Sequence, residues 1–346
     1  VTDNQLPKVS VIVCARNEEN NLRDYLHTLL NQDYPCYEVI VVNDGSEDNT
    51  QWVLEQYAMQ YNHLYITFVP REARVISSKK LALTIGIKAA HYEHLLLTDA
   101  DCRPESRLWI RDMMSAFVQG GEGIEVVLGF GAYFEQKTVL SSLISYDTLF
   151  NGLHYLSAAA HGHPYMGVGR NLAYKKELFF KTGGFKKMMT NRAGDDDLFV
   201  NHVATRKNTA VVSSRASITW SPAKTTMRDW WQQKRRHLSV SHDYRLGTKI
   251  RLALEPISRG LFYLAVIALL VAFACQPIVG SPLSILAAMA LGLFLLRWIV
   301  QTIIINLSAK RMGLHGFNMF TILGMDIFLP LVSLYMLCVP KKQVKW

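Results

Sequence analysis

Cysteine is scarce in this chain, and its few cysteines form no recognisable pattern. The five residues are widely spaced, and no CxxC motif is present: Cys14, Cys36, Cys102, Cys275 and Cys338. Disulfide-rich domains and zinc sites use cysteines in even numbers or at short fixed spacings, so the sequence argues against both. We expect reduced, mostly buried thiols in a protein that faces the cytoplasm.

Internal repeats, low-complexity stretches and a signal-peptide pattern are also missing. Half of the residues are hydrophobic, which excludes a disordered chain. Acidic residues are fewer than basic ones, 28 against 37, and the formal net charge is +9. The basic residues concentrate between Lys224 and Arg259, just before the first long apolar run. That position favours contact with a membrane, and we expect no nucleic-acid partner.

Apolar, β-branched runs alternate with helical patterns over the first two thirds of the chain. The runs predict buried strands at residues 9–14, 37–43, 64–69 and 94–98. Helical spacing of apolar residues predicts helices at residues 20–30, 49–61 and 79–90. A further strand is expected at residues 127–134. The alternation is typical of βαβ units, so we expect an α/β fold with a mostly parallel sheet.

Three apolar segments follow, at residues 257–278, 283–305 and 317–339. Each is close to the ~20 residues with which a helix crosses a bilayer. Lys310 and Arg311 lie in the second linker, and cytoplasmic loops are enriched in such residues. We therefore expect an integral membrane protein, of the bacterial inner membrane, whose larger domain is cytoplasmic.

Two charged residues, Arg297 and Asp326, lie inside the second and third apolar segments. Both are at a similar distance from the linker that joins these segments. Because an unpaired charge in a membrane is costly, we predict that the two pair across a helical hairpin. The alternatives are that Arg297 binds an anionic lipid head or extends to the membrane surface.

Carboxylates follow two of the predicted strands. Asp44 comes directly after residues 37–43, and Asp99 and Asp101 come after residues 94–98. In parallel sheets ligands bind at the carboxyl ends of the strands, so these side chains are expected around one crevice. Mg²⁺ and Mn²⁺ prefer oxygen ligands and neutralise phosphate charge, which makes a nucleotide site a reasonable interpretation. The alternative for Asp99 and Asp101 is a turn that caps a helix.

Other polar residues have two interpretations each. Asp195 and Asp196 belong to an acidic run, in which repulsion favours a proton-accepting carboxylate, but the run also suits the first turn of a helix. Lys79 begins a predicted helix. It contacts a phosphate or the uracil edge of a nucleotide donor, or else it is a solvated surface lysine. The glycine-rich stretch at residues 167–171 allows close approach to a sugar or forms a plain turn.

Read together and in order, these motifs resemble the family-2 glycosyltransferases. The matching stretches are VSVIVCARNE (9–18), VNDGSED (42–48), KKLAL (79–83), TDADC (98–102), GVGRNLAY (167–174), GDDDLF (194–199) and WWQQKRRH (230–237). The resemblance implies a Rossmann-like GT-A fold and an inverting transfer of a sugar from a nucleotide-sugar, with UDP favoured over GDP. The expected cofactor is Mg²⁺ or Mn²⁺.

The resemblance also implies roles for the acidic residues. Asp44 would contact the base or ribose of the donor, Asp99 would assist, and Asp101 would bind the metal. The first donor-binding loop would consist of Ala15, Arg16, Asn17 and Glu18. Asp195 is the expected base. Because Gly194 stands where the family usually has Glu, Asp196 remains an alternative.

The last motif departs from the QxxRW pattern of processive members such as cellulose and hyaluronan synthases. Gln233 and Arg236 remain and are expected to contact the donor, where Arg236 would stabilise the leaving diphosphate. His237 replaces the Trp beneath the acceptor. We expect His237 on the acceptor side, together with Gly169, Arg170 and Asn171.

These features predict three regions and one activity. Residues 1–225 are the expected GT-A catalytic domain, residues 226–256 amphipathic helices at the membrane interface, and residues 257–346 a transmembrane region with about three helices. The missing Trp and the few spans favour a non-processive enzyme. The expected acceptor is a lipid or lipid-linked saccharide, and the alternative is a processive polysaccharide synthase.

Overall fold

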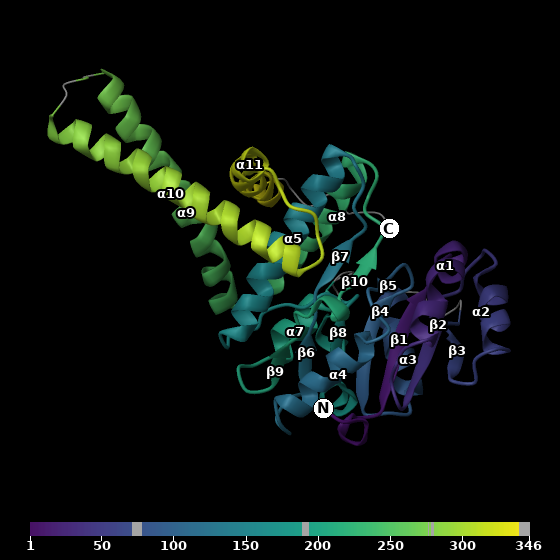
Figure 1. Cartoon of the computed structure of the whole chain (residues 1–346). Coiled ribbons are helices and arrows are strands. Elements are labelled where there is room, and N and C mark those ends of the chain that lie inside the picture. Colours follow the sequence, from purple (N-terminus) through teal and green to yellow (C-terminus); the bar gives the residue numbers. More distant parts are fainter. Residues whose placement is uncertain (71–77, 189–193, 276, 278–279, 339–346) are drawn as a thin grey trace. The chain divides into compact units, whose positions relative to one another are not determined.

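The computed structural model describes residues 1–70, 78–188, 194–275, 277 and 280–338. The chain divides into two compact units, the first ending at Asp243 and the second beginning at Tyr244. The first unit is α/β, and the second is helical (Figure 1).

A seven-stranded sheet of order β3-β2-β1-β4-β8-β6-β9 forms the centre of the first unit. Its strands are β1 (Val9–Ala15), β2 (Tyr37–Asn43), β3 (Leu64–Phe68), β4 (His94–Asp99), β6 (Val126–Leu128), β8 (Leu172–Lys175) and β9 (Thr209–Val211). β1 to β4 are mutually parallel, whereas β8 runs antiparallel to both β4 and β6. The predicted mostly parallel sheet is confirmed, as are its first four strands.

The register brings three strand ends to one level. Cys14 of β1 lies opposite Val42 of β2 and Asp99 of β4. Because parallel strands end at the same edge, the loops that follow β1, β2 and β4 meet there. Three of the predicted donor-binding residues, Ala15, Asp44 and Asp99, lie at this edge.

A second sheet has three short strands in the order β5-β10-β7, namely β5 (Arg103–Pro104), β7 (Gly131–Tyr133) and β10 (Thr219–Ser221). The prediction of one strand at residues 127–134 is therefore wrong, since β6 and β7 belong to different sheets. A Cβ atom on Gly129 would lie 2.5 Å from Asn171 Nδ2, and one on Gly131 would lie 2.2 Å from Arg170 Nε. Both glycines make room for side chains that separate the two strands.

Helices cover the sheet and build the core. They are α1 (Glu19–Leu30), α2 (Thr50–Ala58), α3 (Ser78–Ala89), α4 (Trp109–Gln119), α5 (Val139–Ala160), α6 (Lys176–Lys181), α7 (Asp197–Val203) and α8 (Met227–Val240). The apolar stripe of α1 buries its leucines against the valines of β1 and β2. Each buried leucine contributes about 1.5–3 kcal/mol, so this stripe fixes which face of α1 meets the sheet.

The second unit contains three helices, α9 (Leu246–Cys275), α10 (Pro282–Arg311) and α11 (Met319–Cys338). Ser281 caps α10 by accepting a hydrogen bond from the Ser284 amide, and Pro282 occupies the first helical position, where its missing N–H costs nothing. α9 and α10 are long and apolar enough to cross a membrane, and residues 319–335 form a shorter apolar helix. A short 3₁₀ turn at Ser241–Asp243 separates α8 from α9.

One carboxylate joins these three helices. Asp326 of α11 is 1% exposed and pairs with Arg297 of α10 at 2.8 Å and with Arg259 of α9 at 2.7 Å. Tyr263 and Gln301 donate further hydrogen bonds to it. The predicted pairing of Arg297 with Asp326 is confirmed, and Arg259 is a second partner that the sequence pattern did not indicate.

Candidate active site

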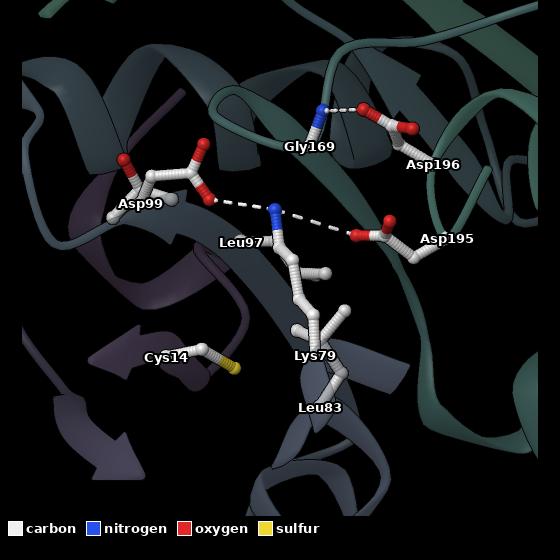
Figure 2. Close-up of a pocket in the computed structure, with 9 residues that line it drawn as sticks. Cys14, Lys79, Leu83, Leu97, Asp99, Gly169, Asp195 and Asp196 are labelled. Atoms are coloured by element: carbon white, nitrogen blue, oxygen red, sulfur yellow. Dashed lines mark hydrogen bonds and ion pairs between the residues drawn. The ribbon is translucent and has the colours of Figure 1, made fainter. Parts of the chain in front are cut away.

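A small pocket opens beside the carboxyl ends of β1 and β4. It is lined by Cys14, Lys79, Leu83, Leu97, Thr98, Asp99, Gly169, Asp195 and Asp196. These residues come from five separate parts of the chain, and charged groups face one another across the space (Figure 2). Five of them were predicted to be functional, namely Lys79, Asp99, Gly169, Asp195 and Asp196.

Lys79 links the two sides of the pocket. Its ammonium lies 2.9 Å from Asp99 Oδ1 and 3.4 Å from Asp195 Oδ2, as Figure 2 shows. Burial opposes the charge of Lys79, but Asp195 and Asp99 raise its pKa well above the usual value. Burial likewise opposes ionisation of Asp99, yet Lys79 lowers the pKa of that carboxyl. The pocket thus holds a persistent cation between two carboxylates.

Asp196 is held by the backbone. It caps α7 by accepting a hydrogen bond from the Asp197 amide at 2.8 Å, and its Oδ2 accepts another from the Gly169 amide at 2.6 Å. A Cβ atom on residue 169 would lie 3.1 Å from this oxygen, so glycine permits the approach. Burial and the neighbouring Asp195 raise the pKa of Asp196.

A turn after β4 gathers candidate metal ligands. The Cys102 amide donates to the Asp99 carbonyl, and potential ligand atoms of Asp99, Asp101 and Cys102 all lie within 4.8 Å of one another. Burial and the charge of Asp99 raise the pKa of Asp101. Two converging carboxylates are a donor set that suits Mg²⁺ or Mn²⁺, whereas the buried thiol is a softer ligand.

The loops after β1 and β2 are tied together. Asn17 has φ of 55°, and its amide donates to Ser46 Oγ while its side-chain oxygen accepts from the Glu47 amide. Asparagine tolerates this left-handed conformation better than most residues do. The Asp44 amide donates to the Ala15 carbonyl at 2.8 Å. The loop containing Ala15, Arg16, Asn17 and Glu18 therefore lies beside Asp44, as the donor-site hypothesis requires.

Arg170 and Asn171 are buried away from the pocket surface. The Arg170 guanidinium donates to Gly131 and Ser221 and lies 4.1 Å from the ring centre of Tyr133. Asn171 is fully buried and makes three side-chain hydrogen bonds to protein groups. These contacts give both side chains a role in joining the two sheets, and they offer no support for the predicted acceptor contacts.

α8 contributes the residues of the last motif. Gln233 donates to the Tyr133 hydroxyl at 2.9 Å, and Arg236 is among the cations that lower the pKa of Asp99. His237 is exposed. The pocket also contains Cys14, which was not predicted to lie in the site, although it stands at the end of a predicted strand. Burial raises the pKa of its thiol, which disfavours the nucleophilic thiolate.

Comparison with known proteins identifies the family. A family model for glycosyl transferase family 2 matches residues 10–185, just over half of the chain. The chain therefore belongs to glycosyl transferase family 2, and the membership predicted from its motifs is confirmed.

Individual relatives are more distant. A probable glycosyltransferase, YdaM of Bacillus subtilis, is 25% identical over 237 residues, which are 67% of this chain and 54% of that protein. Glycosyltransferase AglE of Haloferax volcanii is 32% identical over 126 residues, which are 36% of this chain and 39% of that protein. The chain thus spans about half, or less, of the length of these curated relatives.

A solved structure supports the fold. The mannosyltransferase PcManGT from Pyrobaculum calidifontis, determined in complex with GDP-Man and Mn²⁺, matches 96% of this chain and 88% of its own with a TM-score of 0.57. The two sequences are 20% identical, so the likeness concerns architecture. The predicted GT-A fold is confirmed.

Proposed function

We propose that this protein is an inverting glycosyltransferase that moves a sugar from a nucleotide-sugar, of the UDP type, to a lipid or lipid-linked saccharide. The observation that carries the proposal is the pocket in which Lys79 lies between Asp99 and Asp195. One carboxylate follows a sheet strand at the donor side, and the other comes from the segment before α7. Such an arrangement suits a reaction that needs a cation for the diphosphate and a base for the acceptor.

Asp195 is the proposed base. Its carboxylate faces the pocket and is 11% exposed, whereas both oxygens of Asp196 accept hydrogen bonds from backbone amides. Asp195 takes the proton from an acceptor hydroxyl, and that oxygen attacks the anomeric carbon from the face opposite the diphosphate. Lys79 and Arg236 stabilise the negative charge on the departing nucleoside diphosphate.

Asp101, with Asp99, would hold Mg²⁺ or Mn²⁺. When bound there, the divalent cation neutralises diphosphate charge. The loop from Ala15 to Glu18 and Asp44 would hold the nucleoside, because the two loops are joined by hydrogen bonds at the same sheet edge. Gly169 fixes Asp196 and through it the turn that carries the base.

The proposal of a lipid-linked acceptor rests on the helices of the second unit. α9 and α10 have the length and apolarity of membrane spans, and their large apolar side chains are widely exposed. An enzyme anchored in this way meets acceptors in the membrane, so a lipid-linked hydroxyl is favoured over a soluble one. Basic residues before and after the spans favour a cytoplasmic catalytic unit in a bacterial inner membrane.

The test is nucleoside diphosphate release by protein reconstituted in lipid with Mn²⁺ or Mg²⁺, bacterial lipid extract and a panel of UDP- and GDP-sugars. We expect release with one donor, and loss of about 10²–10⁴-fold in kcat for Asp195→Asn, because a general base contributes that much. Asp101→Ala should abolish metal-dependent release. Asp197→Asn is the matched control, since Asp197 does not line the pocket.

Two results would change the proposal. If no donor bound or reacted, the enzyme would have lost its function and the fold would serve another role. If product chains lengthened on a single primer, the processive polysaccharide synthase would replace the non-processive enzyme.

A further inference from the structure

A buried ion pair joins α8 to α5 outside the pocket. Lys234 Nζ lies 2.5 Å from Asp147 Oδ1, and the two side chains are 12% and 13% exposed. Asn151 donates to the same carboxylate oxygen at 3.1 Å and to the Asp147 carbonyl at 2.8 Å, which fixes the orientation of Asp147. The pair is thus shielded from water and has one defined geometry.

α8 is attached to the first unit at other points as well. Its N-terminus is capped by Thr226, and its two buried residues are Trp230 and Val240. Lys234 follows Trp230 by one helical turn and so shares its inward face. Gln233 bonds Tyr133 next to it. The Asp147–Lys234 pair is therefore a buried contact between α8 and α5 that helps to set the position of α8.

Two functional groups depend on the position of α8. Arg236, the proposed leaving-group cation, lies two residues after Lys234 on the same helix. Val240 packs against the backbone at Gly194, where an added Cβ atom would meet it at 3.0 Å. Gly194 directly precedes Asp195. A shift of α8 would therefore displace both the proposed leaving-group cation and the proposed base.

We propose that Asp147 and Lys234 are positioning residues, which hold α8 so that Arg236 and Asp195 keep their places at the pocket. The inference rests on the proposed function for the roles of those two residues. A buried lysine without its carboxylate must either move toward water or draw water in, and either movement displaces the helix that carries it. The donor-binding edge at β1, β2 and β4 is built without α8 and stays intact.

The first experiment compares Lys234→Met and Asp147→Asn with Arg228→Met, which removes one positive charge from an exposed position of the same helix. We expect the first two variants to lose roughly tenfold or more in kcat, because small misplacements of reacting groups have such effects, and to change the donor KM by a smaller factor. Arg228→Met should have the kcat and the donor KM of the wild type. An unchanged kcat in Lys234→Met, measured on folded protein, would overturn the inference.

The second experiment separates positioning from stability. In an Arg236→Ala background, Lys234→Met should lower kcat less than it does alone, because part of its effect passes through Arg236. The exchanged pair, Asp147→Lys with Lys234→Asp, should recover part of the lost kcat. Full additivity with Arg236→Ala, together with a lowered Tm, would show that the pair only stabilises the fold.

Hydrogen exchange tests the inference even if no donor reacts. Lys234→Met should increase amide exchange in α8 and at Gly194 to Asp196, with β1 and β4 unchanged, and Arg228→Met should not. Absence of donor turnover in the wild type would refute the proposed function, whereas unchanged exchange at Gly194 to Asp196 would refute the positioning role.

Discussion

At the scale of single residues, neighbours in the sequence have different surroundings. Asp195 faces Lys79 across the pocket, while Asp196 is held by two backbone amides. The acidic run suited both a base and a helix cap, and the family resemblance implied Asp195 as the base with Asp196 as an alternative. The sequence could not show which carboxylate the backbone holds, because the Gly169 amide that contacts Asp196 comes from a distant loop.

The two carboxylates should respond differently to substitution. Asp196→Asn keeps an oxygen that caps α7 but leaves the Gly169 amide unpaired and should cost about 1–3 kcal/mol, whereas Asp196→Ala loses the cap as well and should cost about 0.5–2 kcal/mol more. Thermal unfolding of the reconstituted protein measures both. If Asp196→Asn reduced kcat more than Asp195→Asn, Asp196 would be the base.

Gly194 should be intolerant of any side chain. Its φ is +83°, and an added Cβ atom would lie 2.8 Å from Leu198. Gly183 is the control, since its φ is +81° but nothing lies within 4 Å of its added Cβ atom. We expect Gly183→Ala to cost about 1–2 kcal/mol for the left-handed backbone, and Gly194→Ala to cost more and to lower kcat. Equal losses of stability would show that crowding at residue 194 is unimportant.

The predicted site residues that line the pocket lie where a local pattern determines their position. Asp99 follows a continuous apolar strand, and such strands are buried and end at the ligand edge. Arg170 and Asn171 lie in an equally recognisable motif, but their side chains fill space beside Gly131 and Gly129. That packing depends on pairing between segments far apart in the sequence, which no local pattern encodes.

At the scale of elements, strands with strong hydrophobic runs were predicted and the short ones were not. β6 and β7 read as one run because Gly129 and Phe130 between them are compatible with a strand. Their separation is a property of the tertiary packing. The helices of the second unit were predicted from length and apolarity, and the pairing of Arg297 with Asp326 followed from the cost of charge in a membrane.

Asp326 should be the most sensitive position among α9, α10 and α11. Asp326→Ala removes the carboxylate shared by Arg259 and Arg297 and should cost about 3–5 kcal/mol, as the loss of one partner from a buried pair does. Glu255→Gln is the control, because the Glu255 side chain pairs with Arg259 but is 38% exposed. Thermal unfolding in detergent micelles should show a clear loss of Tm for Asp326→Ala and none for Glu255→Gln. Equal losses of Tm would contradict the role of Asp326 as the carboxylate that joins the three helices.

At the scale of the whole molecule, the chain joins a unit with a polar pocket to a unit with exposed apolar helices. Only 19% of residues are charged, and the mean hydropathy of +0.09 conceals how unevenly apolar residues are distributed. The division follows from the sequence, since apolar runs of bilayer length begin only after residue 256. The charged residues at the linkers then predict which linker faces the cytoplasm: the uncharged linker before α10 lies outside, and the linker that follows Lys310 and Arg311 lies inside.

The topology can be measured by cysteine labelling in a variant without native cysteines. With α9 and α10 crossing the membrane, Ser281→Cys should lie outside and Asn318→Cys should face the cytoplasm with Lys310 and Arg311. A membrane-impermeant maleimide should therefore label residue 281 in intact cells and residue 318 in inverted vesicles. Labelling of both residues from one side would contradict the spanning of α10.

The long stretch of chain between β4 and its neighbour β8 has a consequence for folding during translation. β4 is complete once residue 99 has left the ribosome, but β8, its partner on one side, ends at residue 175. At translation rates of about 5–20 residues per second, the edge of β4 stays unpaired for roughly 4–15 s. An unpaired strand edge is a template for pairing with another chain. Nascent chains on one messenger RNA therefore share an interval in which a chaperone, rather than the fold itself, must keep them apart.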